Sequence, residues 1–151
     1  MLDKSKIGKE YPEIRFEIEK GKIREFGKAI GDKNPVYYYE DAAKKEGFEG
    51  LAMPPTFPTT FTAFSLTGGG LFGILDDLNI DLVKVLHGGQ EYEYLKPIKP
   101  GDTVTGKAKI ANIFEKSGKG GTMDFVVLET TYANQDGEKV LIDRSTVIVT
   151  N

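Results

Sequence analysis

The C-terminal half of the chain constrains the fold most, because four strand-forming segments follow one another there. Tyr92 and Tyr94 alternate with glutamates in the first segment, and small or apolar residues recur at alternate positions in the second, from Val104 to Ile110. This period is typical of a strand with one buried face. Turn-forming residues separate the segments at 97–102, 117–121 and 134–137. Strands joined by such short turns pair with opposite directions, so the sequence predicts an antiparallel sheet.

The N-terminal half adds one strand and several helices. Ile14 to Ile18 alternates apolar and charged residues, which predicts a strand. Lys22 to Ile30 has its apolar residues at helical spacing and is followed by glycine, so it predicts a short amphipathic helix. Shorter helices are expected at Asp41 to Glu46 and Leu71 to Leu78. The apolar, threonine-rich segment from Thr59 to Leu66 fits a buried helix that covers the sheet, although its composition also suits a strand.

Length and composition exclude several classes of protein. A chain of 151 residues corresponds to one domain, and the strand and helix order makes it α+β. The 20 basic and 23 acidic residues give a net charge of −3, without the basic stripe of a nucleic-acid-binding protein or a polybasic membrane anchor. Cysteine is absent and His87 is the only histidine, so we expect no disulfide, no metal site and at most one imidazole. Without an apolar leader or membrane span, we expect a cytoplasmic protein.

The densest group of chemically useful side chains follows the first helix. Gly31-Asp32-Lys33-Asn34-Pro35 places a carboxylate immediately beyond the helix end, where Asn34 can orient it. Functional groups tend to occupy such conformationally special segments. The alternative is an Asx turn with a solvated aspartate. Spacing alone leaves both interpretations open.

At this segment the sequence resembles the MaoC-like dehydratases and (R)-specific enoyl-thioester hydratases. Their motif is Gly-Asp-x-Asn-Pro, an aliphatic residue, histidine, five residues, and a small residue. Every element is present here, ending at Ala43, except that Tyr37 replaces the histidine. Further segments resemble landmarks of the N-terminal or non-catalytic branch of that family. They are 7–11, 53–58, 86–92 and 96–102.

The resemblance implies one hot-dog domain over 1–151, an antiparallel sheet wrapped around a central helix. It implies reversible addition of water to an enoyl thioester, with Asp32 as the catalytic carboxylate, Asn34 in a supporting position and Tyr37 at the position of the imidazole. It also implies an oxyanion donor between Pro54 and Phe57. Prolines have no N–H, so Thr56 is the expected donor, with Pro55 and Phe57 beside it at the substrate. No redox cofactor or metal is implied.

The substitution at Tyr37 leaves the activity open. A tyrosine, with a reference pKa of about 10, is a poor base at neutral pH, whereas histidine near 6.5 is well matched to proton transfer. The chain is therefore either a hydro-lyase that acts on acyl-CoA or acyl-carrier-protein thioesters, or an acyl-binding subunit paired with a histidine-bearing partner. A thioesterase is a third reading, although 55–66 lacks the acidic or amide group expected on the central helix. The resemblance implies a homodimer, or a heterodimer with a second MaoC-like subunit.

Other candidate residues have two readings each. His87 is either a replacement catalytic or substrate-binding group or a structural residue beside two glycines. Lys44 and Lys45 either meet a phosphate of the thioester carrier or lie on a solvated helix face. The tandem Asp76-Asp77 favours a solvated turn over a metal ligand. The glycines at 68–70 indicate a flexible connector, because no phosphate-loop residues follow them.

Overall fold

The computed structural model of the protein describes residues 2–63, 70–118 and 121–150. The sheet contains five strands, which are β1 (Glu10–Glu17), β2 (Val85–Tyr94), β3 (Thr103–Gly118), β4 (Gly121–Ala133) and β5 (Lys139–Thr150). The helices are α1 (Lys20–Ala29), α2 (Glu40–Lys45), α3 (Thr59–Ala63) and α4 (Leu71–Asp77), with 3-10 turns at Lys4–Lys6, Pro35–Tyr37 and Leu82–Lys84. The predicted α+β order is therefore confirmed.

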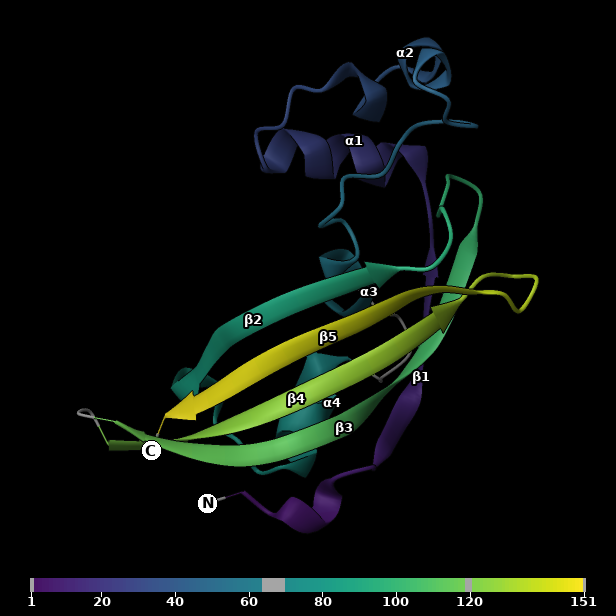
Figure 1. Ribbon diagram of the computed structural model, residues 1–151. Coiled ribbons are helices and arrows are strands. Elements are labelled where there is room, and N and C mark those ends of the chain that lie inside the picture. The colour runs from purple at the N-terminus through teal and green to yellow at the C-terminus, as the bar shows by residue number, and fades with distance from the viewer. Residues whose placement is uncertain (1, 64–69, 119–120, 151) are drawn as a thin grey trace.

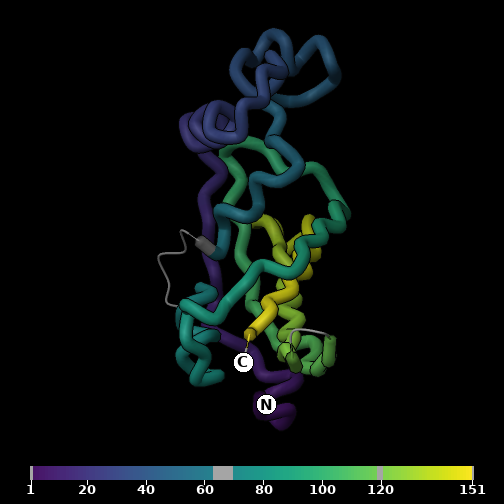
Figure 2. The backbone as a smooth tube through the Cα atoms, turned by 90° about the vertical axis from the view of Figure 1, so that its left-hand side faces the viewer, coloured from purple at the N-terminus to yellow at the C-terminus, as the bar shows by residue number. Residues whose placement is uncertain are grey.

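The strands form one antiparallel sheet in the order β1-β3-β4-β5-β2. Helices α3 and α4 lie on one face of this sheet, and the segment containing α1 and α2 stands above one end of it (Figures 1 and 2). Residues 117, 118 and 121 of the turn expected at 117–121 belong instead to the strands, because β3 continues to Gly118 and pairs there with Gly121. The helix expected over Thr59 to Leu66 is confirmed as far as Ala63, and its remainder lies outside the described residues.

Aromatic side chains fill the space between α3 and the sheet. Phe57 and Phe61 are fully buried, and their ring centroids lie 6.0 and 4.8 Å from that of Phe16 on β1. On the sheet side, Phe61 packs edge-on against the buried Tyr132 of β4 at 5.3 Å. Each ring removes about 150–250 Å² from water, so this cluster fixes the position of α3 over the sheet.

The opposite face of the sheet carries charged residues in register across all five strands. Glu10 of β1 pairs with Lys109 of β3, which pairs with Glu129 of β4. Glu129 in turn lies opposite Arg144 of β5, whose guanidinium contacts Glu91 of β2. We call these five residues the charge ladder. It marks this face as the solvent side of the sheet.

Candidate functional site

The carboxylate of Asp32 is positioned by the end of α1. Gly31 adopts φ +72°, and its N–H donates to the Lys28 carbonyl while the Asp32 N–H donates to that of Gly27 at 3.0 Å. These two bonds form a Schellman motif, which ends the helix and turns the chain sharply. The half-buried Asp32 side chain then accepts a hydrogen bond from the Asn34 N–H at 2.9 Å. The Asx turn considered from the sequence is thus present.

Asn34 supports the turn rather than the carboxylate directly. Its side-chain oxygen accepts a hydrogen bond from the Val36 N–H at 3.3 Å, so it caps the 3-10 turn that follows. Only its backbone N–H contacts Asp32. The orientation that Asn34 gives to the aspartate therefore comes through the main chain.

Tyr37 lies beside this turn, partly buried against the core. Burial raises the pKa of its phenol, and the negative charge of Asp32 raises that pKa further. Tyr37 can therefore donate a hydrogen bond at neutral pH but is not an efficient base. Its neighbour Tyr38 donates a hydrogen bond to the Asp32 backbone carbonyl, whereas Tyr39 is 68% exposed.

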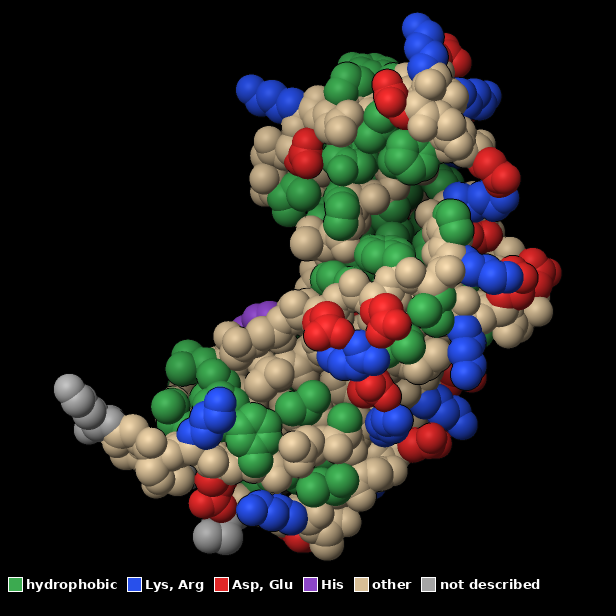
Figure 3. Space-filling model, viewed as in Figure 1, with side chains coloured by type: hydrophobic (Ala, Val, Ile, Leu, Met, Phe, Trp, Pro, Cys, Tyr) green, Lys and Arg blue, Asp and Glu red, His purple; other side chains and the backbone are tan. Residues whose placement is uncertain are grey.

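A groove of about 1310 Å³ passes between this segment and one end of the sheet. Its walls include Asn34, Tyr37, Met53, Pro55 and Tyr94. Apolar side chains gather in the hollow between the α1–α2 segment and the sheet (Figure 3). Four of the sequence-predicted site residues do not line this groove. They are Asp32, Thr56, Phe57 and His87.

The segment before α3 contains an exposed residue, Thr56, directly followed by a core residue, Phe57. Thr56 is exposed, and within the described ranges its N–H has no hydrogen-bond acceptor in the protein. This N–H is therefore available to an acceptor from outside the chain. Phe57 is instead fully buried in the aromatic cluster, so it supports the site from behind. The Tyr94 hydroxyl donates to the Pro55 carbonyl at 2.8 Å and thereby ties this segment to β2.

His87 takes part in a hydrogen-bonded chain that reaches a carboxyl group not selected from the sequence. Its Nε2 lies 3.1 Å from the Gln90 side-chain oxygen, and the Gln90 amide donates to Asp143 of β5. Asp143 is only 6% exposed, and burial raises its pKa to about 7. The sequence does carry a signal for this position. Asp143 is two residues from the apolar Leu141, and residues two apart in a strand share a face, so the carboxyl belongs to the inner face of β5.

The remaining candidates have structural roles or lie at the margin of the groove. Asp77 binds Lys9 and Lys6 at 2.7 and 3.1 Å and accepts a hydrogen bond from Tyr11, so it fastens α4 to the N-terminal segment. Lysine contacts hold the pKa of the Asp77 carboxyl far below its usual range. Lys45 lines the groove. Gly70 caps α4, while 68–69 lie outside the described residues.

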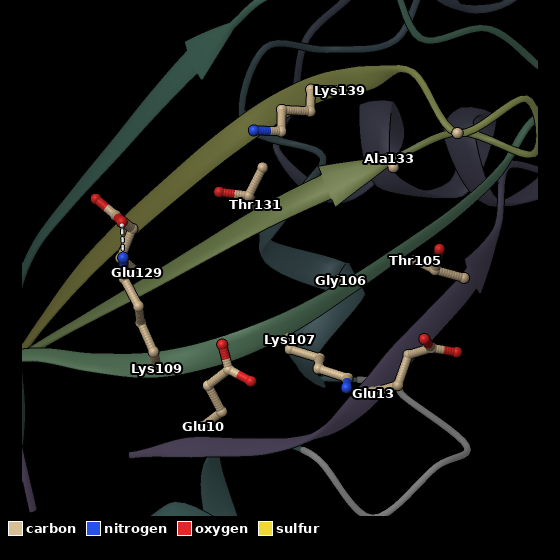
Figure 4. A pocket seen from close by; sticks show the side chains of 11 residues that line it. Glu10, Glu13, Thr105, Gly106, Lys107, Lys109, Glu129, Thr131, Ala133 and Lys139 are labelled. Atoms are coloured by element: carbon tan, nitrogen blue, oxygen red, sulfur yellow. Dashed lines mark ion pairs between the residues drawn. The ribbon is translucent and has the colours of Figure 1, made fainter. Parts of the chain in front are cut away.

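A second depression, of about 420 Å³, lies on the outer face of the sheet (Figure 4). Its lining alternates acidic and basic side chains, including Glu13 and Lys107, and Lys109 forms an ion pair with Glu129 at 2.9 Å. In the part of the chain that the structure describes, no cluster of three metal-ligating side chains occurs, and no helix is long and apolar enough to cross a bilayer. This depression offers neither an apolar wall nor a metal centre.

Comparison with known proteins gives concordant results. The family model described as FAS1-like, dehydratase domain region, matches residues 5–143. A UPF0336 protein of Streptomyces avermitilis is 34% identical over 143 residues, which cover 93% of this chain and 89% of that protein.

Two solved structures share the fold over nearly their whole length. The HadBC (3R-hydroxyacyl-ACP dehydratase) complex of Mycobacterium tuberculosis contains a chain that is 26% identical, with a TM-score of 0.74 and coverage of 95% of this chain and 96% of that one. A MaoC-like dehydratase from Rhodospirillum rubrum is 24% identical, with a TM-score of 0.69 and coverage of 96% and 92%. These similarities confirm the expected hot-dog fold.

Proposed function

Because the chain belongs to the FAS1-like dehydratase-region family, with the hot-dog fold of the MaoC-like dehydratases, we propose that it acts on acyl thioesters. The reaction is the reversible dehydration of an (R)-3-hydroxyacyl thioester to the enoyl thioester. The observation that carries this proposal is the placement of Asp32 on a rigid turn, electrostatically coupled to Tyr37 at the wall of a large groove.

The roles of the residues follow from the chemistry. In hydration, the oxygen of water bonds to C3 and a proton is delivered to C2, while negative charge develops on the thioester oxygen. Asp32 holds the water, accepts its proton and passes that proton on to C2, and the Tyr37 hydroxyl donates a hydrogen bond beside it. The free Thr56 N–H stabilises the oxyanion. Lys45 lines the groove, and its ammonium group can bind a phosphate of a CoA or carrier-protein arm.

A second candidate function is favoured by the raised pKa of Tyr37. A phenol that stays protonated cannot replace the imidazole of the motif as a base, so the chain would bind the acyl group while a histidine-bearing partner performs the proton transfer. The similar HadBC dehydratase is a complex of subunits. Strand β2 lies at one edge of the sheet with Leu86 54% exposed, which gives such a partner a strand to pair with.

Hydration of crotonyl-CoA and of the crotonyl carrier-protein thioester tests the first candidate. Asp32→Asn should abolish the rate of the purified protein, and Tyr37→His should raise it by about 10²-fold or more, since general acid–base catalysis typically contributes 10²–10⁴-fold. Tyr39→Phe is the matched control, because it removes a neighbouring hydroxyl that is mostly exposed. Equal rates for the wild type and Asp32→Asn would remove this aspartate from the mechanism.

Adding a histidine-bearing MaoC-like subunit tests the second candidate. If the chain is an acyl-binding subunit, it should be inactive alone, form a mixed dimer visible by light scattering, and activate the partner. A mass near 16.7 kDa in the mixture, together with unchanged partner activity, would argue against a paired dehydratase.

A further inference from the structure

The outer face of the sheet, opposite α3 and α4, changes character along the strands. The half nearer the groove carries the charge ladder, and the other half carries a row of apolar side chains. Leu86 of β2 lies opposite Ile148 of β5. Ile148 in turn lies opposite Phe125 of β4, which lies opposite Phe114 of β3. We call these four residues the apolar row. Figure 3 views this face, and hydrophobic side chains gather on it toward the end of the sheet where the C-terminus lies.

The apolar row lies outside the hydrophobic core formed by the described residues. The side chains that alternate with it are buried in that core, at positions 113, 126, 147 and 149. Because successive side chains of a strand point to opposite faces, the row points outward. Leu86 is 54% exposed and the other three are half-buried. The rings of Phe114 and Phe125 stack with centroids 4.9 Å apart, so part of their burial comes from each other.

The apolar area extends beyond the row along the strands. On β4, Met123 and Val127 lie two residues to either side of Phe125 and therefore share its face. Four strands about 4.8 Å apart, and four levels of side chains about 7 Å apart from Met123 to the charge ladder, give a surface of about 500 Å². Two such surfaces total about 1,000 Å², which reaches the lower limit for a specific interface. An apolar patch of this size usually marks an interaction site.

The charge ladder indicates which partner fits this face. From β2 to β1 its charges alternate strictly between acid and base. A second copy, turned about a two-fold axis parallel to the strands, presents the same ladder in reverse order. An axis lying over a strand brings each charge against a like charge, whereas an axis midway between two strands brings each acid against a base. The ladder is therefore complementary to itself.

The apolar row selects the position of the axis. It spans β2, β5, β4 and β3, so its centre lies midway between β5 and β4. An axis at this position covers the whole row of one copy with that of the other. The same axis satisfies the rule of the ladder, because it falls between two strands. Two independent features thus agree on one arrangement.

We propose that two copies of this chain associate through their outer sheet faces, about a two-fold axis parallel to the strands and midway between β4 and β5. Phe125 then packs against the partner's Ile148, and Phe114 against the partner's Leu86. Sheets that pack face to face lie about 10 Å apart, a distance that such side chains fill from both sides. A two-fold pair is closed, so it does not grow into larger particles.

The ladders pair at one side of this apolar centre. Arg144 faces the partner's Glu129, and Lys109 faces the partner's Glu91, with each pair formed twice by symmetry. The groove stays open, because it lies at the other end of the sheet, beside the α1–α2 segment. The association is therefore independent of the proposed function.

Sedimentation velocity of the full chain from about 5 to 500 µM tests the association, since an interface of this size is a weak one. Phe125→Thr and Ile148→Thr replace an outward apolar side chain by a polar residue that suits a strand. Each should raise the dissociation constant by about 10-fold or more, because both copies carry the change. Tyr39→Thr is the matched control, since it removes an aromatic side chain that is 68% exposed on the α1–α2 segment.

The comparison of masses decides whether the face is an interface. Over part of the concentration range the two sheet variants should have half the mass of the wild type, whether that is a monomer against a dimer or an edge-paired dimer against a tetramer. Circular dichroism melting identifies a variant that has not folded, and the other variant then carries the test. Equal masses for the wild type and a folded sheet variant at every concentration would overturn the proposal.

Reversing charges tests the two-fold arrangement itself. The double variant Glu91→Lys, Glu129→Lys makes four members of the ladder basic, and Lys109→Glu, Arg144→Glu makes the whole ladder acidic. Each double variant alone should associate less than the wild type, and an equimolar mixture of the two should recover the larger mass. If each double variant associates alone as the wild type does, or if the mixture recovers nothing, the ladders do not face each other and the proposed axis is wrong.

Discussion

Replacing Asp143 with asparagine should change how the stability of the fold depends on pH. The carboxyl has an ordinary pKa of 3.8, and burial raises it to about 7 in the folded protein. Below pH 3.8 the group is protonated in both the folded and the unfolded chain, so it contributes no pH dependence there. Between these values the unfolded chain releases the proton while the folded chain retains it, and rising pH therefore favours unfolding.

The size of the effect follows from the two pKa values. At about 1.4 kcal/mol per pKa unit, a rise from 3.8 to about 7 corresponds to about 4 kcal/mol, reached once pH exceeds the folded pKa. The asparagine variant lacks this titration. The wild type should therefore lose about 4 kcal/mol of unfolding free energy relative to Asp143→Asn between pH 4 and pH 7.5.

Urea denaturation at closely spaced pH values measures this difference directly. Comparing the two proteins at each pH cancels the titration of the groups that do not interact with Asp143. Asp136→Asn, in the exposed turn between β4 and β5, serves as the matched control and should run parallel to the wild type. If the Asp143→Asn curve also runs parallel to the wild type, the carboxyl ionises normally and its burial does not govern its protonation.

Three further predictions concern the support of the site and the ion pairs of the sheet. Phe57→Ala should cost about 3–5 kcal/mol in thermal unfolding, because it empties a fully buried aromatic position, whereas Phe72→Ala, at 65% exposed, should change little. A small effect at Phe57 would contradict its role behind the segment of Thr56. Asn34→Ala removes the cap of the 3-10 turn and should cost about 1 kcal/mol in chemical denaturation while lowering any hydration rate; an unchanged rate would mean that Asp32 keeps its position without this cap. Arg144→Met should lower the melting temperature at low salt, and the difference should shrink in 1 M salt, since exposed ion pairs are screened; a difference independent of salt would point to packing instead.

The sequence predicts the architecture well because its signals are local. Strand alternation, the glycine at the end of α1 and the turn residues between strands all act within a few positions, and all but the turn expected at 117–121 appear where expected. The turn at Asp32 is equally local, and its Asx hydrogen bond is one of the two interpretations that the sequence allows. These features depend on neighbouring residues rather than on how distant elements meet.

The grouping of Asp143 with Tyr92 and Tyr132 could not be found in this way. Asp143, Tyr92 and Tyr132 come from three strands, and their proximity depends on the register of β2 against β5 and of β5 against β4. That register includes the shift between His87 and Gly89, which the sequence shows only as a pair of glycines. The full burial of Phe57 has the same origin, because its aromatic partners lie on β1, α1 and α3.

The charge ladder has a practical consequence for handling the protein. Its member on β2, Glu91, and the nearby Glu93 lie on an edge strand whose main chain is open to a further strand. Two copies that meet edge to edge at random bring like charges together, and this repulsion discourages uncontrolled stacking of sheets. Concentrated salt weakens that repulsion. Preparations should accordingly stay monodisperse at low ionic strength and form large particles in concentrated salt, unless a partner subunit already occupies the edge.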